Sequence, residues 1–127
     1  MNTTTILEHH LELSEQVHRL LLEENSMLKE LQSAPTADFL ERKGALLGEL
    51  DDSLEAVKHL RQSQRAFSET ERQLILNAQN RTMQGLYLDR ENEQLLLKHS
   101  VEVKPPDQKR AVTQERLQAA YGKSPEA

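Results

Sequence analysis

The stretch that decides the fold is Thr5–Ser33, TILEHHLELSEQVHRLLLEENSMLKELQS. One row of side chains recurs in it at alternating steps of four and three residues, which is typical of one face of an α-helix. The row consists of Ile6, His10, Leu13, Val17, Leu20, Glu24, Met27 and Leu31. His10 and Glu24 are its two polar positions. Because Leu21 and Leu28 widen the row, we expect a helix in a globular bundle rather than a strict two-stranded coiled coil.

Two boundary signals follow this stretch. Pro35 lacks the amide needed to continue a helix, and Thr36 can cap the next helix with Asp38 near its positive end. Ser68 and Glu71 have the spacing of a capping box, which opens a third helix. The boundaries predict helices at about residues 5–33, 37–67 and 69–99.

No run rich in Val, Ile or Thr has the length of a strand, so we predict no strands. The predicted fold is all-α, an elongated antiparallel bundle of three long amphipathic helices spanning residues 1–100. Residues 101–127 are expected to form a flexible tail with a short helix at about 108–121.

Two features of the later helices are open to more than one interpretation. Gly44 and Gly48 lie four residues apart, where they indicate either close packing of a neighbouring helix or simple tolerance. On the third helix, Ile75, Ala78, Thr82 and Leu86 form one row, and Leu76, Asn80, Met83 and Tyr87 form another. This wide apolar arc is either core throughout or a partly exposed surface for a partner.

The tail after Pro105 and Pro106 has few apolar residues. Leu117 and Tyr121 form an i,i+4 pair, and a helix there would bury little apolar area. A short helix needs a partner to persist in water, so we expect the isolated tail to be mostly disordered. It is either a binding segment or a frayed terminus.

Composition excludes several function classes for this chain of 127 residues. The net charge of −5, with basic and acidic residues interleaved, argues against nucleic acid. No cysteine is present, and no apolar run approaches the length of a membrane span. We expect a cytoplasmic protein of one domain without membrane insertion.

Motifs for chemistry are weak. Glu15 and His18 have the Glu-x-x-His spacing of carboxylate-bridged di-iron bundles, but such a site needs a second pair, which the sequence lacks. No nucleophile elbow or phosphate-binding glycine loop occurs. We predict a protein that is not an enzyme and has no metal site and no cofactor.

Four blocks of sequence, in their order and spacing, resemble the FlgN-type flagellar export chaperones. They are Leu20-Leu21-Leu22-Glu23-Glu24, Glu41-Arg42-Lys43-Gly44-Ala45-Leu46-Leu47-Gly48-Glu49-Leu50, Leu76-Asn77-Ala78-Gln79-Asn80, and Tyr121-Gly122. The resemblance spans nearly the whole chain. The sequence departs from the family pattern at Arg81-Thr82-Met83, where the family commonly has a glycine and bulkier apolar residues.

The resemblance implies a cytoplasmic chaperone that holds hook-associated proteins, which form the hook-filament junction, until the flagellar type III apparatus exports them. Export-gate contact would fall on Tyr121 and Gly122. Client contact would fall on the tail, at Val112, Arg116, Leu117 and Ala120. No nucleotide or metal would be needed, and the chain would be a monomer or weak homodimer.

Asn77, Asn80 and Met83 on the third helix are structural or interaction candidates. The two amides either bridge neighbouring helices or contact a partner, and we favour the structural role. A competing function class is a self-associating coiled-coil scaffold or adaptor, in which the same apolar rows join copies of the chain.

Overall fold

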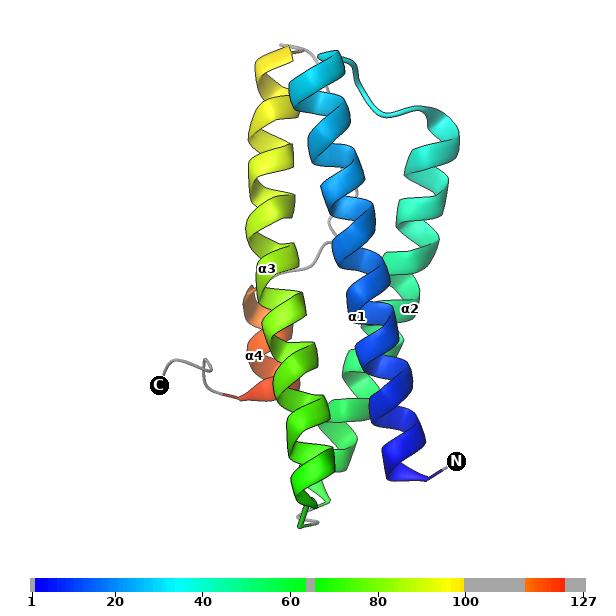
Figure 1. Cartoon of the computed structure of the whole chain (residues 1–127), viewed down its shortest axis with the longest axis vertical. Coiled ribbons are helices and arrows are strands. Elements are labelled where there is room, and N and C mark those ends of the chain that lie inside the picture. Colours follow the sequence, from blue (N-terminus) through cyan, green and yellow to red (C-terminus); the bar gives the residue numbers. More distant parts are fainter. Residues whose placement is uncertain (1, 64–65, 100–113, 123–127) are drawn as a thin grey trace.

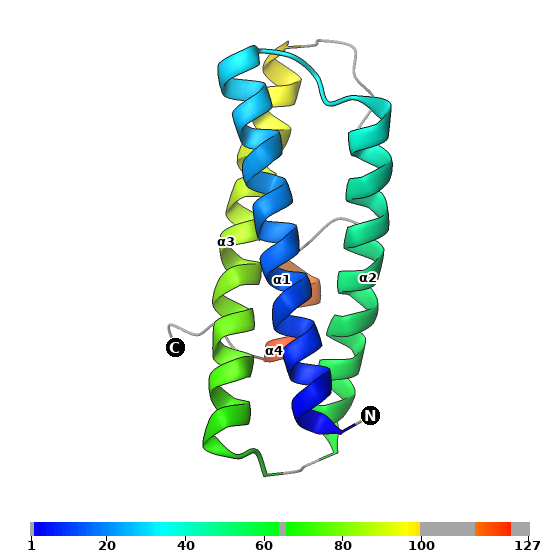
Figure 2. The ribbon, with the colours of Figure 1, turned by 45° about the vertical axis from the view of Figure 1, so that its right-hand side comes forward.

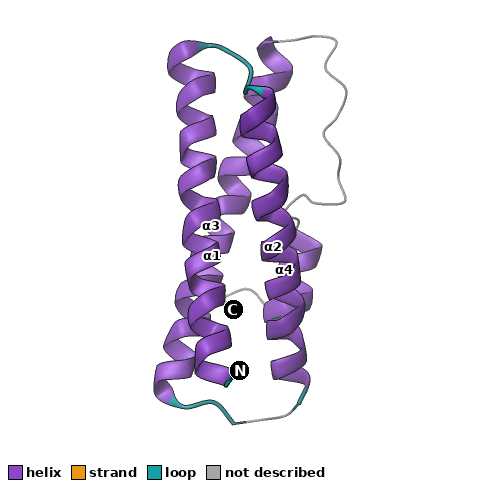
Figure 3. Cartoon of the chain, turned by 90° about the vertical axis from the view of Figure 1, so that its right-hand side faces the viewer, coloured by secondary structure: helices purple, strands orange, loops and turns teal. Residues whose placement is uncertain are grey.

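The structure is a computed structural model of the chain, and it describes residues 2–63, 66–99 and 114–122. Its elements are the α-helices α1 (Thr3–Ser26), α2 (Ala37–Gln62), α3 (Glu69–His99) and α4 (Gln114–Tyr121), and a π-helical turn, η1 (Met27–Leu31). The described residues contain helices and no strands, which confirms the all-α prediction (Figure 3). The bundle has a fourth helix in addition to the three long ones.

The three long helices lie side by side and give the molecule an elongated shape (Figure 1). Helix α1 packs against both α2 and α3. Helix α2 runs antiparallel to α1, and α3 runs parallel to α1 (Figure 1). Helix α4 packs against α2 and α3 and lies behind α1 in Figure 2. It therefore closes the side of the bundle that α1 leaves uncovered.

Local sequence signals set the helix boundaries. The amide of Phe39 donates to the Thr36 hydroxyl, which caps α2. The Ser68 and Glu71 side chains exchange hydrogen bonds with each other's backbone amides at the start of α3, so the predicted capping box forms.

Two helix ends differ from the prediction. The first helix widens into the π-helical turn η1, which ends at Leu31 rather than at Ser33. Gln32 caps it with a left-handed φ of 50°. Helix α2 ends at Gln62, not at Phe67, because the Ser63 hydroxyl donates to the Leu60 carbonyl and competes with the helical hydrogen-bond ladder.

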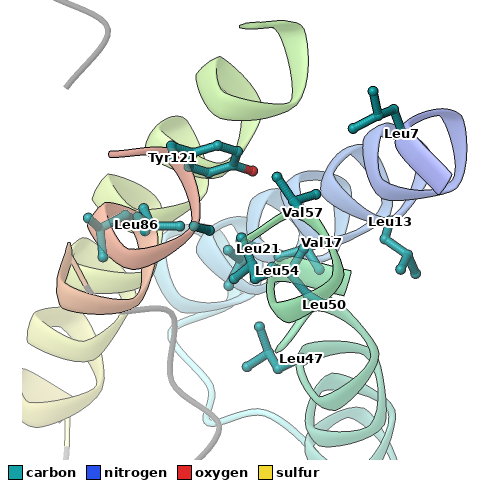
Figure 4. Packing of buried hydrophobic residues seen from close by; sticks show 12 residues of the cluster. Leu7, Leu13, Val17, Leu21, Leu47, Leu50, Leu54, Val57, Leu86 and Tyr121 are labelled. Atoms are coloured by element: carbon teal, nitrogen blue, oxygen red, sulfur yellow. The ribbon is translucent and has the colours of Figure 1, made fainter. Parts of the chain in front are cut away.

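The core is a single cluster of buried apolar side chains contributed by all four α-helices (Figure 4). It consists of Leu7, Leu13, Val17, Leu21, Leu47, Leu50, Leu54, Val57, Leu86, Leu117, Ala120 and Tyr121. Removing such side chains from water is the main force that holds helices together in a bundle. Because its last three members come from α4, this helix is part of the core.

For Gly48, the space around the residue decides between the two interpretations. A Cβ atom added at Gly48 would meet nothing within 4 Å, so close packing is the wrong interpretation for this residue. At Gly85 on α3 an added Cβ would lie 3.4 Å from Cδ1 of Leu21, which is a van der Waals contact with the neighbouring helix.

Candidate functional site

Tyr121, the sequence-based candidate for contact with an export gate, is buried. Only 4% of its surface is exposed, and its ring points from α4 into the core (Figure 4). The sequence predicted that a helix in the tail would bury little apolar area, and this expectation is wrong for α4. Leu117 and Ala120 are also buried, because the spacing of 117, 120 and 121 puts all three on one face of α4.

The Tyr121 hydroxyl lies in a buried polar cluster that joins all four helices. It is 2.6 Å from Nε2 of His10 on α1 and 3.3 Å from Oγ1 of Thr82 on α3. The other ring nitrogen of His10, Nδ1, is 2.7 Å from Oγ of Ser53 on α2. We call these four residues, His10, Ser53, Thr82 and Tyr121, the His10 cluster.

The His10 cluster suits a neutral imidazole. In a neutral ring one nitrogen donates and the other accepts, and the two flanking hydroxyls can complement either arrangement. Burial, aided by the neighbouring His9, lowers the pKa of His10 from 6.5 to about 4. Burial likewise raises the pKa of the Tyr121 phenol, so both rings are uncharged at neutral pH.

Two contacts fix the ends of α4. The Arg116 guanidinium donates to the Asp51 carboxylate on α2. Gly122 ends the helix with a left-handed φ of +81°, and its amide donates to the Gln118 carbonyl. A Cβ atom at this position would lie 3.0 Å from Nη2 of Arg61. The Tyr-Gly pair thus has a structural reason: the tyrosine anchors the helix and the glycine ends it.

The remaining tail candidate, Val112, lies outside the described residues, so the structure places three of the four client candidates. Arg116 is half-buried beside α2, whereas Leu117 and Ala120 face the core. In this closed arrangement their apolar surfaces are not available to a client.

The candidates on α3 lie on the outer side of the bundle. Asn77 and Asn80 are exposed, and Met83 is half-buried at the edge of the core. The amide pair that bridges two helices is a different one, in which Nδ2 of Asn25 donates to Oδ1 of Asn92 at 2.9 Å.

The outer row on α3 includes two large apolar residues that contact water. Leu76 is 41% exposed and Tyr87 is 60% exposed. The apolar arc of the third helix is therefore not core throughout. Its inner row, with Ala78, Thr82 and Leu86, is buried, and the outer row is in part available to a partner.

A second polar cluster, largely shielded from water, joins α1, α2 and α3. Nζ of Lys43 on α2 contacts Glu24 of α1 at 2.8 Å and Asp89 of α3 at 3.2 Å. Asn92 donates to the same Glu24 carboxylate. Burial by itself lowers the pKa of Lys43, but Asp89 and Glu24 outweigh burial, and the net pKa is raised.

In the sequence, His10 and Glu24 stand out only as the polar positions of an apolar row. Their position in that row was the signal that they are buried, because a polar side chain in the core needs a partner. The partners come from distant parts of the chain, so their identity was not readable from local spacing.

The described parts of the chain contain no group of three or more His, Asp or Glu side chains that could hold a metal ion. Within residues 2–63, 66–99 and 114–122, no helix is both long and apolar enough to cross a membrane. Known protein-family models, curated proteins and solved structures give no match to this chain.

Proposed function

We propose that the chain is a cytoplasmic type III flagellar export chaperone of the FlgN type, which binds hook-associated proteins and delivers them to the export gate. The proposal rests on the resemblance of its four sequence blocks, in order and spacing, to that family. The single structural observation that supports this proposal is the position of the last block. Tyr121 and Gly122 lie at the end of a short, separate helix that packs against α2 and α3.

A chaperone of this kind needs a binding segment and no catalytic group. The described residues form a helical scaffold, and α4 is an amphipathic segment of the type that docks in apolar grooves. Leu117 and Ala120 can contact a client, and Tyr121 can contact the gate, only if α4 leaves the surface of α2 and α3 on which it packs. The affinity for a partner is then reduced by the free energy of undocking.

The test is titration calorimetry of the full chain against a hook-associated client and against a soluble fragment of the export gate. The intact chain is expected to bind both. Leu117→Asp is expected to weaken client binding, and Tyr121→Ala is expected to weaken gate binding.

A matched control separates contact from stability. Val57→Ala damages the same core from α2 and leaves every α4 side chain in place. If Val57→Ala lowers gate affinity as much as Tyr121→Ala does, the tyrosine acts only through stability. An intact chain that binds neither protein would exclude the chaperone function.

The exposed side chains of α3 favour a second candidate, the self-associating scaffold. Leu76 and Tyr87 present apolar area on one side of the helix, as expected of a self-association surface. Sedimentation over a wide range of concentrations distinguishes the two functions. A scaffold forms oligomers that Leu76→Lys disrupts, whereas a chaperone stays monomeric or weakly dimeric.

A further inference from the structure

Helix α4 contributes to the core, but it is the shortest α-helix in the described residues. It has eight residues, whereas isolated helices shorter than about 12–15 residues are marginal in water. Its helical form therefore depends on the surface it contacts. That surface, which we call the seat of α4, lies between α2 and α3, helices of 26 and 31 residues.

The seat of α4 has apolar and charged parts. Leu117, Ala120 and Tyr121 supply the apolar anchors, at the i, i+3 and i+4 positions that recur in helix-in-groove recognition. Asp51 pairs with Arg116, which immediately precedes the first anchor.

A buried polar pair at the end of the seat recognises the tyrosine hydroxyl. His10 Nε2 and Thr82 Oγ1 both lie within hydrogen-bond distance of this group. A phenylalanine would leave the His10 nitrogen without its partner inside the core, which is unfavourable. The seat therefore discriminates between tyrosine and phenylalanine.

We infer that the seat between α2 and α3 is a receptor for a short helix with the order Arg-Leu-x-x-Ala-Tyr, and that α4 of a second copy can occupy it in trans. The second copy is the occupant because its α4 carries the same anchors, the same arginine for Asp51 and the same hydroxyl for His10. This inference does not depend on the chaperone function, since it concerns only the seat and α4.

The experiment uses full-length chains and a fluorescein-labelled peptide of residues 111–125, which represents α4 of the second copy. Leu117→Asp in the full chain places a charge at a buried anchor and vacates the seat. The labelled peptide is titrated with this variant and with the unchanged chain, and its fluorescence anisotropy is measured.

We expect the peptide to bind the Leu117→Asp chain at least about tenfold more tightly than the unchanged chain, whose own α4 competes at high effective concentration. A peptide with Tyr121→Phe is expected to bind at least about fivefold more weakly. A peptide carrying Leu117→Asp should not bind, and one carrying Gln118→Ala should bind normally, because Gln118 is exposed on α4.

Three results would overturn the inference. One is the absence of binding to the vacated seat, and another is equal binding to the unchanged and Leu117→Asp chains, which would mean nonspecific adhesion. The third is loss of helical circular dichroism in both Leu117→Asp and a second seat-vacating variant, Tyr121→Ala. Such a loss would make α4 an inseparable part of the bundle.

Discussion

Nε2 of His10 lies 2.6 Å from the hydroxyl of Tyr121, although the two residues are 111 positions apart in the chain. This contact joins the start of the first helix to the end of the last one. It is also buried, since His10 has no exposed surface. The contact makes the position of α4 sensitive to the protonation of one imidazole.

Stability should fall as the solution is acidified below pH 6.5. The folded-state pKa of His10, about 4, is lower than the ordinary value of 6.5, so protons bind the unfolded chain more tightly. The neutral, buried His10 contributes fully to the free energy of unfolding above pH 6.5, and this contribution is lost progressively as the pH falls toward 4. It amounts to about 2 kcal/mol between pH 7.5 and pH 5. Urea unfolding at several pH values measures it.

Carboxylates also titrate in acid, so the histidine needs its own control. His10→Asn should reduce the pH dependence, whereas His59→Asn, at an exposed histidine on α2, should leave it unchanged. An equal pH dependence in the unchanged and His10→Asn chains would contradict the assignment to His10.

Removing the hydroxyl of Tyr121 should destabilise the fold. Tyr121→Phe keeps the ring and leaves the buried His10 nitrogen without a partner, which costs about 1–3 kcal/mol of unfolding free energy. Tyr87→Phe is the matched control, because the Tyr87 side chain is exposed, and its effect should stay within about 0.5 kcal/mol. Equal effects in chemical denaturation would show that the cluster does not stabilise α4.

Replacing Lys43 should lower the free energy of unfolding far more than replacing a surface lysine. Lys43→Met removes the cation from the buried Glu24 carboxylate and the half-buried Asp89 carboxylate, and should cost about 3–5 kcal/mol. The lysine at position 29 pairs with Glu91 on the surface, so Lys29→Met should cost no more than about 1 kcal/mol. Denaturant midpoints of the two variants test the difference, and similar losses would contradict it.

Two glycine substitutions should change the stability of the fold in opposite directions. Gly122→Ala forces a left-handed φ on a residue with a Cβ atom and crowds Arg61, so it should destabilise by about 1 kcal/mol or more. Gly48→Ala lies inside α2 with open space around it and should stabilise by about 0.5–1 kcal/mol. Thermal unfolding of both variants provides the test, and a shift in the same direction would refute the argument.

Local signals in the sequence predicted much of the fold. The capping box at Ser68 and the cap at Thr36 depend only on neighbouring residues, so both were readable. The end of α2 at Gln62 was missed because no proline or glycine marks it, and the next clear boundary signal in the sequence is the capping box at Ser68.

The seat of α4 could not be predicted in the same way. Leu117 and Tyr121 were recognised as an i,i+4 pair, but their burial depends on a surface made by α2 and α3. Local composition made the tail look too polar to pack. Three well-placed anchors were enough, because the surface that receives them was already formed by longer helices.

The two polar clusters also limit how the helices can slide past one another. His10, Val17 and Glu24 lie seven residues apart on α1, so a purely apolar row would pack almost equally well after a shift of one heptad. Such a shift would move His10 away from Ser53 and Glu24 away from Lys43, and would leave buried polar groups unpaired at both levels. The bundle therefore has one favourable axial alignment where a leucine-only seam would have several.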